Sequence, residues 1–155
     1  MSRCTYRVIY GDTDQMGVVY YANYLAFFER GRCEYMRERG FDYAAFERDG
    51  FMLPVTEAFV KYRQPARFDD LLVIETIMTA ASRITATFSY RVLRDVDSVL
   101  LVEGTTTHAC LTREGRPVRW PAPIKVLMPE ALFASAGVAP DLRKSSPPLP
   151  QGESP

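Results

Sequence analysis

The sequence predicts an α+β domain in which a curved antiparallel sheet packs on one long helix. Two patterns support this prediction: large apolar residues recur with three-and-four spacing downstream of residue 22, and several later segments alternate apolar and polar residues. The predicted order is one strand, the helix, and then about four strands joined by short turns. Consecutive strands joined by short turns pair antiparallel, and an apolar helix stripe must be covered by the sheet.

The long helix is expected from about Ala22 to Arg39. Charged residues lie opposite an apolar stripe, and Gly40 suits a left-handed cap at the C-terminal end. At 1.5 Å per residue the helix spans about 27 Å, which is enough to cross a small domain. The stripe consists of Tyr24, Phe27, Phe28, Gly31 and Tyr35.

The strands are predicted from alternation and from the turn residues between them. In the strand beginning at Ile84 the alternation is strict, which indicates a half-buried antiparallel strand, and Gly104 marks a possible bulge in the last strand. A short helix is expected over Lys125–Ala134. The predicted strands are Thr5–Tyr10, Leu53–Arg63, Leu71–Met78, Ile84–Val92 and Val99–Leu111.

The chain length of 155 residues predicts one domain, assigned to residues 1–134. With 47% hydrophobic residues the chain can bury a proper core. Residues 135–155 are rich in Pro, Ser and Gly and have few large apolar residues, so this tail is expected to be disordered and to take no part in the chemistry.

Composition excludes several classes of function. Lys plus Arg and Asp plus Glu number 19 each, so no net field draws the chain to nucleic acid. No apolar run reaches the roughly 20 residues of a bilayer span and no signal sequence is visible, so we expect a soluble, cytoplasmic protein without stable membrane insertion. The three cysteines are scattered, which predicts reduced thiols and neither a disulfide framework nor a metal site.

The segment from Asp12 to Tyr24 carries the candidate chemistry. It places Asp12, Asp14 and Gly17 shortly before the start of the helix, where backbone N–H groups have no intrahelical acceptor. On spacing alone, an Asx turn that caps the helix is the simpler interpretation. A metal-binding Asp-x-Asp pair is a further alternative, but no other ligand cluster supports it.

The run YGDTDQMGVVYYANYLAFFERGR, from Tyr10 to Arg32, resembles the hot-dog-fold acyl-CoA thioesterases of the 4-hydroxybenzoyl-CoA thioesterase and YbgC type. The segments LPVTE, beginning at Leu53, and YRQPARFDD, beginning at Tyr62, are similar as well. The resemblance covers about residues 6–127. It implies a hot-dog fold, in which the antiparallel sheet wraps around the long helix.

The resemblance also implies roles for individual residues. Asp14 would be the catalytic carboxylate, and the backbone N–H of Tyr21 would polarise the thioester carbonyl. Many relatives have histidine where Tyr21 stands, which leaves Asp14 as the acid–base or nucleophilic group. Gly17 would turn the loop, and Arg83 would contact the CoA phosphates, with Arg67, Arg116 and Arg63 as further candidates.

The expected reaction is hydrolysis of an acyl-CoA thioester to the free acid and CoA. CoA is part of the substrate, so no separate cofactor and no metal are expected. The resemblance further implies that subunits pair as a homodimer or homotetramer with active sites at the interface, and open sheet edges make such pairing physically reasonable.

Two other functions remain open from the sequence. A hot-dog dehydratase or hydratase would need a histidine with an acidic partner, and His108, the only histidine, is expected to be structural. A non-catalytic subunit that binds acyl-CoA or acyl carrier protein would tolerate loss of Asp14. Around the motif, Tyr20 and Tyr24 are expected to pack, and Glu29 to form a surface or interface ion pair.

Overall fold

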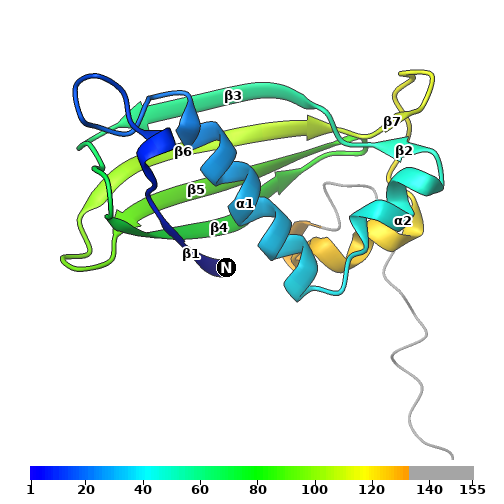
Figure 1. The fold of residues 1–155 in the computed structure, drawn as a ribbon. Helices are drawn as coiled ribbons and strands as arrows, with labels where there is room; N and C mark the ends of the chain where they lie inside the picture. The colour runs from blue at the N-terminus through cyan, green and yellow to red at the C-terminus, as the bar shows by residue number, and fades with distance from the viewer. Residues whose placement is uncertain (133–155) are drawn as a thin grey trace, which may run out of the picture.

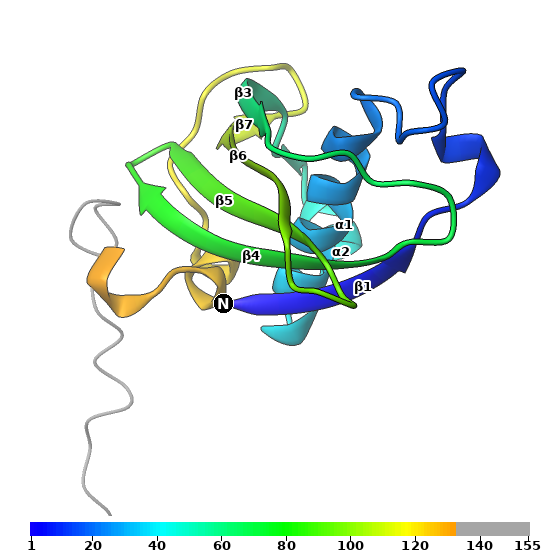
Figure 2. The same cartoon turned by 90° about the vertical axis from the view of Figure 1, so that its left-hand side faces the viewer.

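The computed structural model describes residues 1–132, and its main sheet has five antiparallel strands in the spatial order β1-β4-β5-β6-β3. The sheet curves around one long helix, α1 (Figure 1), and the view from the end shows α1 within the concave face (Figure 2). The predicted hot-dog α+β architecture is therefore confirmed. The strands of the main sheet are β1 (Ser2–Arg7), β3 (Val55–Tyr62), β4 (Leu71–Ala81), β5 (Thr85–Arg94) and β6 (Leu100–Ala109).

Smaller elements flank this core. The helix α1 spans Asn23–Glu38, and α2 spans Tyr43–Arg48; strands β2 (Phe51–Met52) and β7 (Leu111–Thr112) form a separate antiparallel pair. One 3-10 segment, η1 (Tyr10–Asp12), follows the first strand. Two more, η2 (Ala122–Leu127) and η3 (Glu130–Leu132), lie at the end of the described residues. None of the helices within residues 1–132 is long and apolar enough to span a bilayer.

The helix α1 buries the predicted stripe against the sheet. Phe28 is fully buried and its ring stacks on that of Tyr90, with centroids 4.4 Å apart and planes 4° from parallel. A Cβ added to Gly31 would collide with Thr76 Oγ1 and lie 2.8 Å from Cγ2 of Ile74. Glycine at this position therefore lets the helix backbone approach β4 closely.

The register of the strands defines two ends of the sheet. At one end, which we call the Tyr62 end, Tyr62 pairs with Val102, and Arg7 pairs with Leu71. At the opposite end, which we call the Val55 end, Val55 pairs with His108. The Asp14 loop and the start of α1 lie at the Tyr62 end (Figure 1).

Two local predictions need correction. The first strand runs over Ser2–Arg7 and not Thr5–Tyr10, because the chain turns at Tyr10 into η1, where the Asp12 carboxylate accepts the N–H of Ile9. Gly104 is not a bulge: pairing continues through it to Val60 and Tyr90. Glycine is needed there because a Cβ would collide with the Phe59 carbonyl oxygen.

The C-terminal prediction is partly wrong. In place of a helix over Lys125–Ala134, the described part of the chain contains η2 and η3, separated by Pro129. Pro129 lacks the N–H that a continuous helix requires. Residues 133–134 and the tail 135–155 predicted to be disordered lie outside the described residues.

Candidate active site

Asp12 holds the loop that precedes α1. Its Oδ2 accepts hydrogen bonds from the Tyr6 hydroxyl at 2.8 Å and the Ile9 N–H at 2.9 Å. Its backbone carbonyl accepts the N–H of Tyr20 at 2.8 Å and the side-chain amide of Asn23 at 2.9 Å. These contacts tie β1 to the first turn of α1, so Asp12 has a structural role.

Asp14 lies at the base of a tight turn. Its N–H donates to the Val18 carbonyl at 2.9 Å, its carbonyl accepts the N–H of Gly17 at 2.9 Å, and Gly17 has φ +71°. The carboxylate Oδ1 accepts the N–H of Met16 at 2.8 Å, which is the predicted Asx turn. Within residues 1–132 no donor bonds to Oδ2, so one carboxylate oxygen stays available to a ligand.

The start of α1 presents backbone donors close to this loop. Ala22 stands at the N-cap, and no side chain caps the helix there. The Asn23 N–H bonds to the Tyr20 carbonyl at 2.9 Å, whereas the N–H groups of Tyr21 and Ala22 have no acceptor among the described residues. A helix N-terminus with free N–H groups favours negative charge.

Asp14 and Tyr21 lie in the walls of one cavity of about 280 Å³. Its walls are mostly apolar and come from three segments: the Asp14 loop, the start of α1, and the end of β3 with the residues that follow it. The lining residues are Asp14, Met16, Val18, Val19, Tyr21, Tyr24, Tyr62, Arg63, Gln64 and Pro65.

Two other cavities lie along α1. A larger one, about 690 Å³, lies between the second half of α1 and α2, and another of about 330 Å³ lies between α1 and the inner face of the sheet. Neither is lined by Asp14, Tyr21 or Ala22. We assign the candidate site to the smaller cavity because a carboxylate and free N–H donors meet there.

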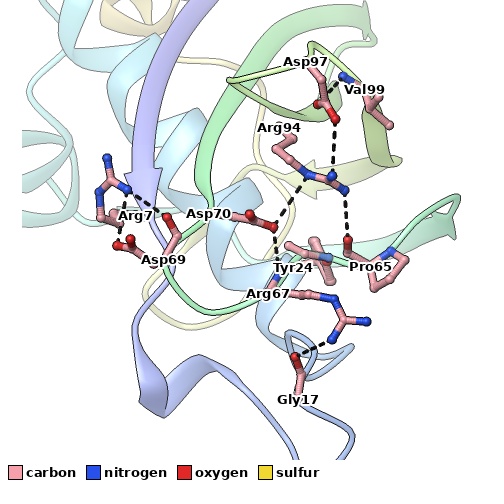
Figure 3. A network of polar contacts seen from close by, with 11 residues as sticks. Arg7, Gly17, Tyr24, Pro65, Arg67, Asp69, Asp70, Arg94, Asp97 and Val99 are labelled. Carbon is pink, nitrogen blue, oxygen red and sulfur yellow. Dashed lines mark hydrogen bonds and ion pairs between the residues drawn. The ribbon is translucent and has the colours of Figure 1, made fainter.

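Arg67 closes one side of the Asp14 loop. Its guanidinium lies 3.4 Å from the Gly17 carbonyl oxygen, and its backbone N–H donates to Asp70 at 2.8 Å. Arg94 in turn contacts Asp70 at 3.7 Å and the Pro65 carbonyl at 3.4 Å (Figure 3). This network holds the segment after β3 in place, so a basic side chain is kept beside the candidate site.

Two predicted CoA-binding residues lie elsewhere in the chain. Arg83 is exposed in the turn between β4 and β5, and Arg116 is exposed in the turn after β7. Both turns are at the Val55 end of the sheet, opposite Asp14 (Figure 1). A single chain therefore brings together Asp14, Gly17, Tyr21 and Arg67, but not Arg83 and Arg116.

His108 is structural, as predicted. It is 1% exposed at the Val55 end, with Nδ1 3.1 Å from the Leu53 carbonyl and Nε2 2.8 Å from Thr106 Oγ1. Burial lowers its pKa to about 4. Within a single chain, His108 and Asp14 lie at opposite ends of the sheet.

Sequence reasoning missed Tyr62. Its hydroxyl donates to the Tyr21 carbonyl at 3.0 Å, across 41 residues of sequence, and its ring meets that of Tyr24 edge-on at 5.7 Å. No local sequence pattern predicts this contact, because it depends on where β3 ends relative to α1. A tyrosine as the final residue of an edge strand was the only available signal.

The described residues contain no group of three or more His, Cys, Asp or Glu side chains arranged to hold a metal. What the site does present, within this part of the chain, is a carboxylate and unpaired backbone N–H donors in the walls of one mostly apolar cavity. Such a pair can bind a polarised carbonyl oxygen through the N–H groups and bring a nucleophile or a base to its carbon.

A family model described as "Thioesterase-like superfamily" matches residues 8–132. The chain belongs to this superfamily. Because the match includes the Asp14 loop, α1 and all strands from β3 onward, it covers every wall of the candidate site.

Individual members of the superfamily are also similar. The acyl-CoA thioester hydrolase YbgC of Escherichia coli O6:H1 is 37% identical over 105 residues, which cover 68% of this chain and 78% of that protein. The acyl-CoA thioesterase YbgC of Haemophilus influenzae is 36% identical over 121 residues, covering 77% and 88%. A crystal structure of a hypothetical protein from Thermus thermophilus superposes with TM-score 0.77 at 34% identity, covering 82% of this chain and 97% of the other.

Proposed function

We propose that this thioesterase-superfamily member hydrolyses acyl-CoA thioesters to the free carboxylic acid and CoA, with Asp14 as the essential carboxylate. One observation carries the proposal: Asp14 and the uncapped start of α1 form walls of the same apolar cavity. The related YbgC proteins of two bacteria, named as acyl-CoA thioesterases, support the choice of thioester as substrate.

The chemistry follows from what a thioester requires. Its thiolate leaves readily because a thiol has a pKa of about 8.5, so the site needs little acid assistance. In our proposal the Tyr21 N–H donates to the thioester carbonyl oxygen and stabilises the oxyanion that develops on it. The carbonyl carbon then lies within reach of the Asp14 carboxylate or of a water molecule held by it.

Asp14 has two routes to the same products. As a nucleophile it attacks the carbonyl carbon, expels the CoA thiolate and forms a mixed anhydride that water then cleaves. As a general base it takes a proton from water while the water oxygen attacks. A single turnover in H2¹⁸O tests the nucleophilic route, because ¹⁸O found in the Asp14 carboxylate identifies an anhydride that water cleaved at the Asp14 carbonyl, and the general-base route cannot place the label there.

CoA recognition is assigned to basic groups. Arg67 lies beside Gly17 and is the candidate from the same subunit. We propose that Arg83 and Arg116 act from a second subunit: β3 is an edge strand, and antiparallel pairing of two β3 strands brings the Val55 end of one subunit beside the Tyr62 end of the other. We further propose that these homodimers pair again as homotetramers and that the enzyme acts in the cytoplasm. CoA is part of the substrate, and the proposal includes no separate cofactor.

Release of free thiol from a panel of acyl-CoA esters tests the proposal. The panel spans acetyl, long-chain and benzoyl esters, and the variants are Asp14→Asn and Asp49→Asn. We expect Asp14→Asn to lower kcat by about 100-fold or more, because the amide supplies neither a nucleophile nor a base. Asp49, at the C-terminal end of α2, is a matched control that should retain wild-type turnover.

Turnover by Asp14→Asn at near the wild-type rate would remove Asp14 from the mechanism. If the wild-type protein binds the esters but hydrolyses none of them, the chain is a binding subunit and not an enzyme. The ester class hydrolysed with the highest kcat/KM identifies the acyl group for which the cavity is suited.

A further inference from the structure

The start of α1 has no side-chain N-cap. The N-cap residue Ala22 has no side chain able to accept a hydrogen bond, and the structure contains no side-chain cap there. The peptide groups at this end nevertheless need a defined orientation if one of their N–H groups is to meet a substrate oxygen. The direction of the Tyr21 N–H must therefore be set by other contacts.

Two hydrogen bonds hold the peptides that meet at Tyr21. The peptide that carries the Tyr21 N–H has its carbonyl, that of Tyr20, bonded to the Asn23 N–H at 2.9 Å. The next peptide has its carbonyl, that of Tyr21, bonded to the Tyr62 hydroxyl at 3.0 Å. A trans peptide is planar with its N–H and C=O opposed, so the first bond points the Tyr21 N–H away from the helix body.

Tyr62 is itself well placed for this task. It is the last residue of β3, so its backbone is paired with Val102 in the sheet. Its ring contacts Tyr24 edge-on, with planes at 71°, and its side chain lines the cavity together with Asp14. Partial burial and the neighbouring Tyr21 raise its pKa, so the hydroxyl remains a neutral donor around neutral pH.

We propose that Tyr62 is a positioning residue for thioester hydrolysis: its hydroxyl holds the Tyr21–Ala22 peptide from β3 and so fixes the backbone on the C-terminal side of Tyr21, which together with the Tyr20–Asn23 bond keeps the Tyr21 N–H directed at the substrate carbonyl. The inference rests on the proposed function and adds a residue to it. Tyr62 acts through Tyr21 and takes no part in bond making or breaking. The hydrogen bond from Tyr62, on β3, holds the start of α1 where no side-chain N-cap does so.

Tyr62→Phe removes the hydroxyl and keeps the ring against Tyr24. We expect kcat to fall about tenfold with KM changed less than about twofold, because the N–H donor is displaced and not deleted; deletion of an oxyanion donor typically costs 100-fold or more. The measurement is thiol release by the full-length protein, with the best ester of the panel.

The matched control is Tyr35→Phe. The Tyr35 hydroxyl also donates from a tyrosine to a backbone carbonyl, that of Leu127 at 2.9 Å, but it is buried in the second half of α1, away from the Asp14 cavity. Its loss should lower the melting temperature and leave kcat unchanged. A fall in kcat for Tyr62→Phe alone then reports positioning and not general loosening.

A spectroscopic readout tests the effect on the carbonyl directly. In the Asp14→Asn background, a ¹³C-labelled acyl-CoA should show a carbonyl stretch lowered by binding, and addition of Tyr62→Phe should reduce that shift. An unchanged kcat, or an unchanged carbonyl shift accompanied by a raised KM, would overturn the inference. Absence of hydrolysis by the wild-type protein would instead refute the proposed function, so the two failures are distinguishable.

Discussion

At the scale of single residues, neighbouring carboxylates have different tasks because their surroundings differ. Asp12 Oδ2 accepts two hydrogen bonds, from the Tyr6 hydroxyl and the Ile9 N–H, whereas Asp14 commits only Oδ1, to the Met16 N–H. The Asx-turn interpretation is therefore confirmed for Asp14, and it is compatible with the catalytic role proposed for this residue. The turn orients one oxygen and leaves the other for chemistry.

His108 shows how a buried residue acquires a defined protonation state. A carbonyl only accepts, so Nδ1 carries the proton that bonds to Leu53, and Nε2 accepts from the Thr106 hydroxyl, which accepts in turn from Tyr90 at 2.8 Å. Burial chiefly, together with the charge of Arg32, lowers the pKa of His108 to about 4. A protonated ring would break this chain of bonds.

We therefore predict that acid destabilises the protein through His108. The folded-state pKa lies below the unfolded value near 6.5, so the unfolded chain takes up the proton first. The contribution is complete above pH 6.5 and is lost as the pH falls from 6.5 to about 4, by about 3 kcal/mol in total. Urea unfolding across this range should show a smaller loss for His108→Gln; parallel profiles for the two proteins would contradict the assignment.

At the scale of elements, α1 is shaped by how closely the sheet approaches it. Its apolar stripe was predictable from spacing alone, and all five predicted members are buried. The reason for a glycine within that stripe was not predictable. A glycine in a helix normally costs stability relative to alanine, and only the packing against Thr76 and Ile74 explains its presence at position 31.

Gly31→Ala should therefore destabilise the protein in spite of the better helix propensity of alanine. Overpacking against β4 costs about 1–3 kcal/mol, and the propensity gain of about 1 kcal/mol offsets only part of it. The free energy of unfolding in urea is the measurement. Gly31→Ala combined with Thr76→Ala should recover part of the loss, and an increase in stability for the single variant would show that α1 is less closely packed than described.

At the scale of the whole molecule, the exposed edge strand β3 sets the expected assembly. Phe59 and Val55 are 60% and 53% exposed on this strand, which has a free hydrogen-bonding edge because it ends the sheet. A long exposed edge strand with apolar side chains favours pairing with a strand of another chain. Pairing there would also place the turns that carry Arg83 and Arg116 near the Tyr62 end of the other subunit.

Phe59→Lys is predicted to weaken this assembly and to lower activity with it. Sedimentation equilibrium should find the wild-type protein at a multiple of the 17.6 kDa chain mass and shift the variant toward the single chain, because a buried unpaired charge opposes association. Val96→Lys, at an exposed apolar residue in the turn between β5 and β6, is the control. A monomeric wild-type protein with full activity would refute the proposed role of a second subunit.

The sequence alone determined the long helix, the order of the main strands and the local turn around Asp14, because periodicity and turn chemistry act over a few residues. It predicted α1 within one residue at each end, the strand order along the chain, and the left-handed Gly40. Tertiary structure decided what these elements bring together. The Tyr62–Tyr21 bond, the close approaches at Gly31 and Gly104, and the distance of Arg83 from Asp14 all depend on strand register and packing between residues far apart in sequence, which local patterns do not specify.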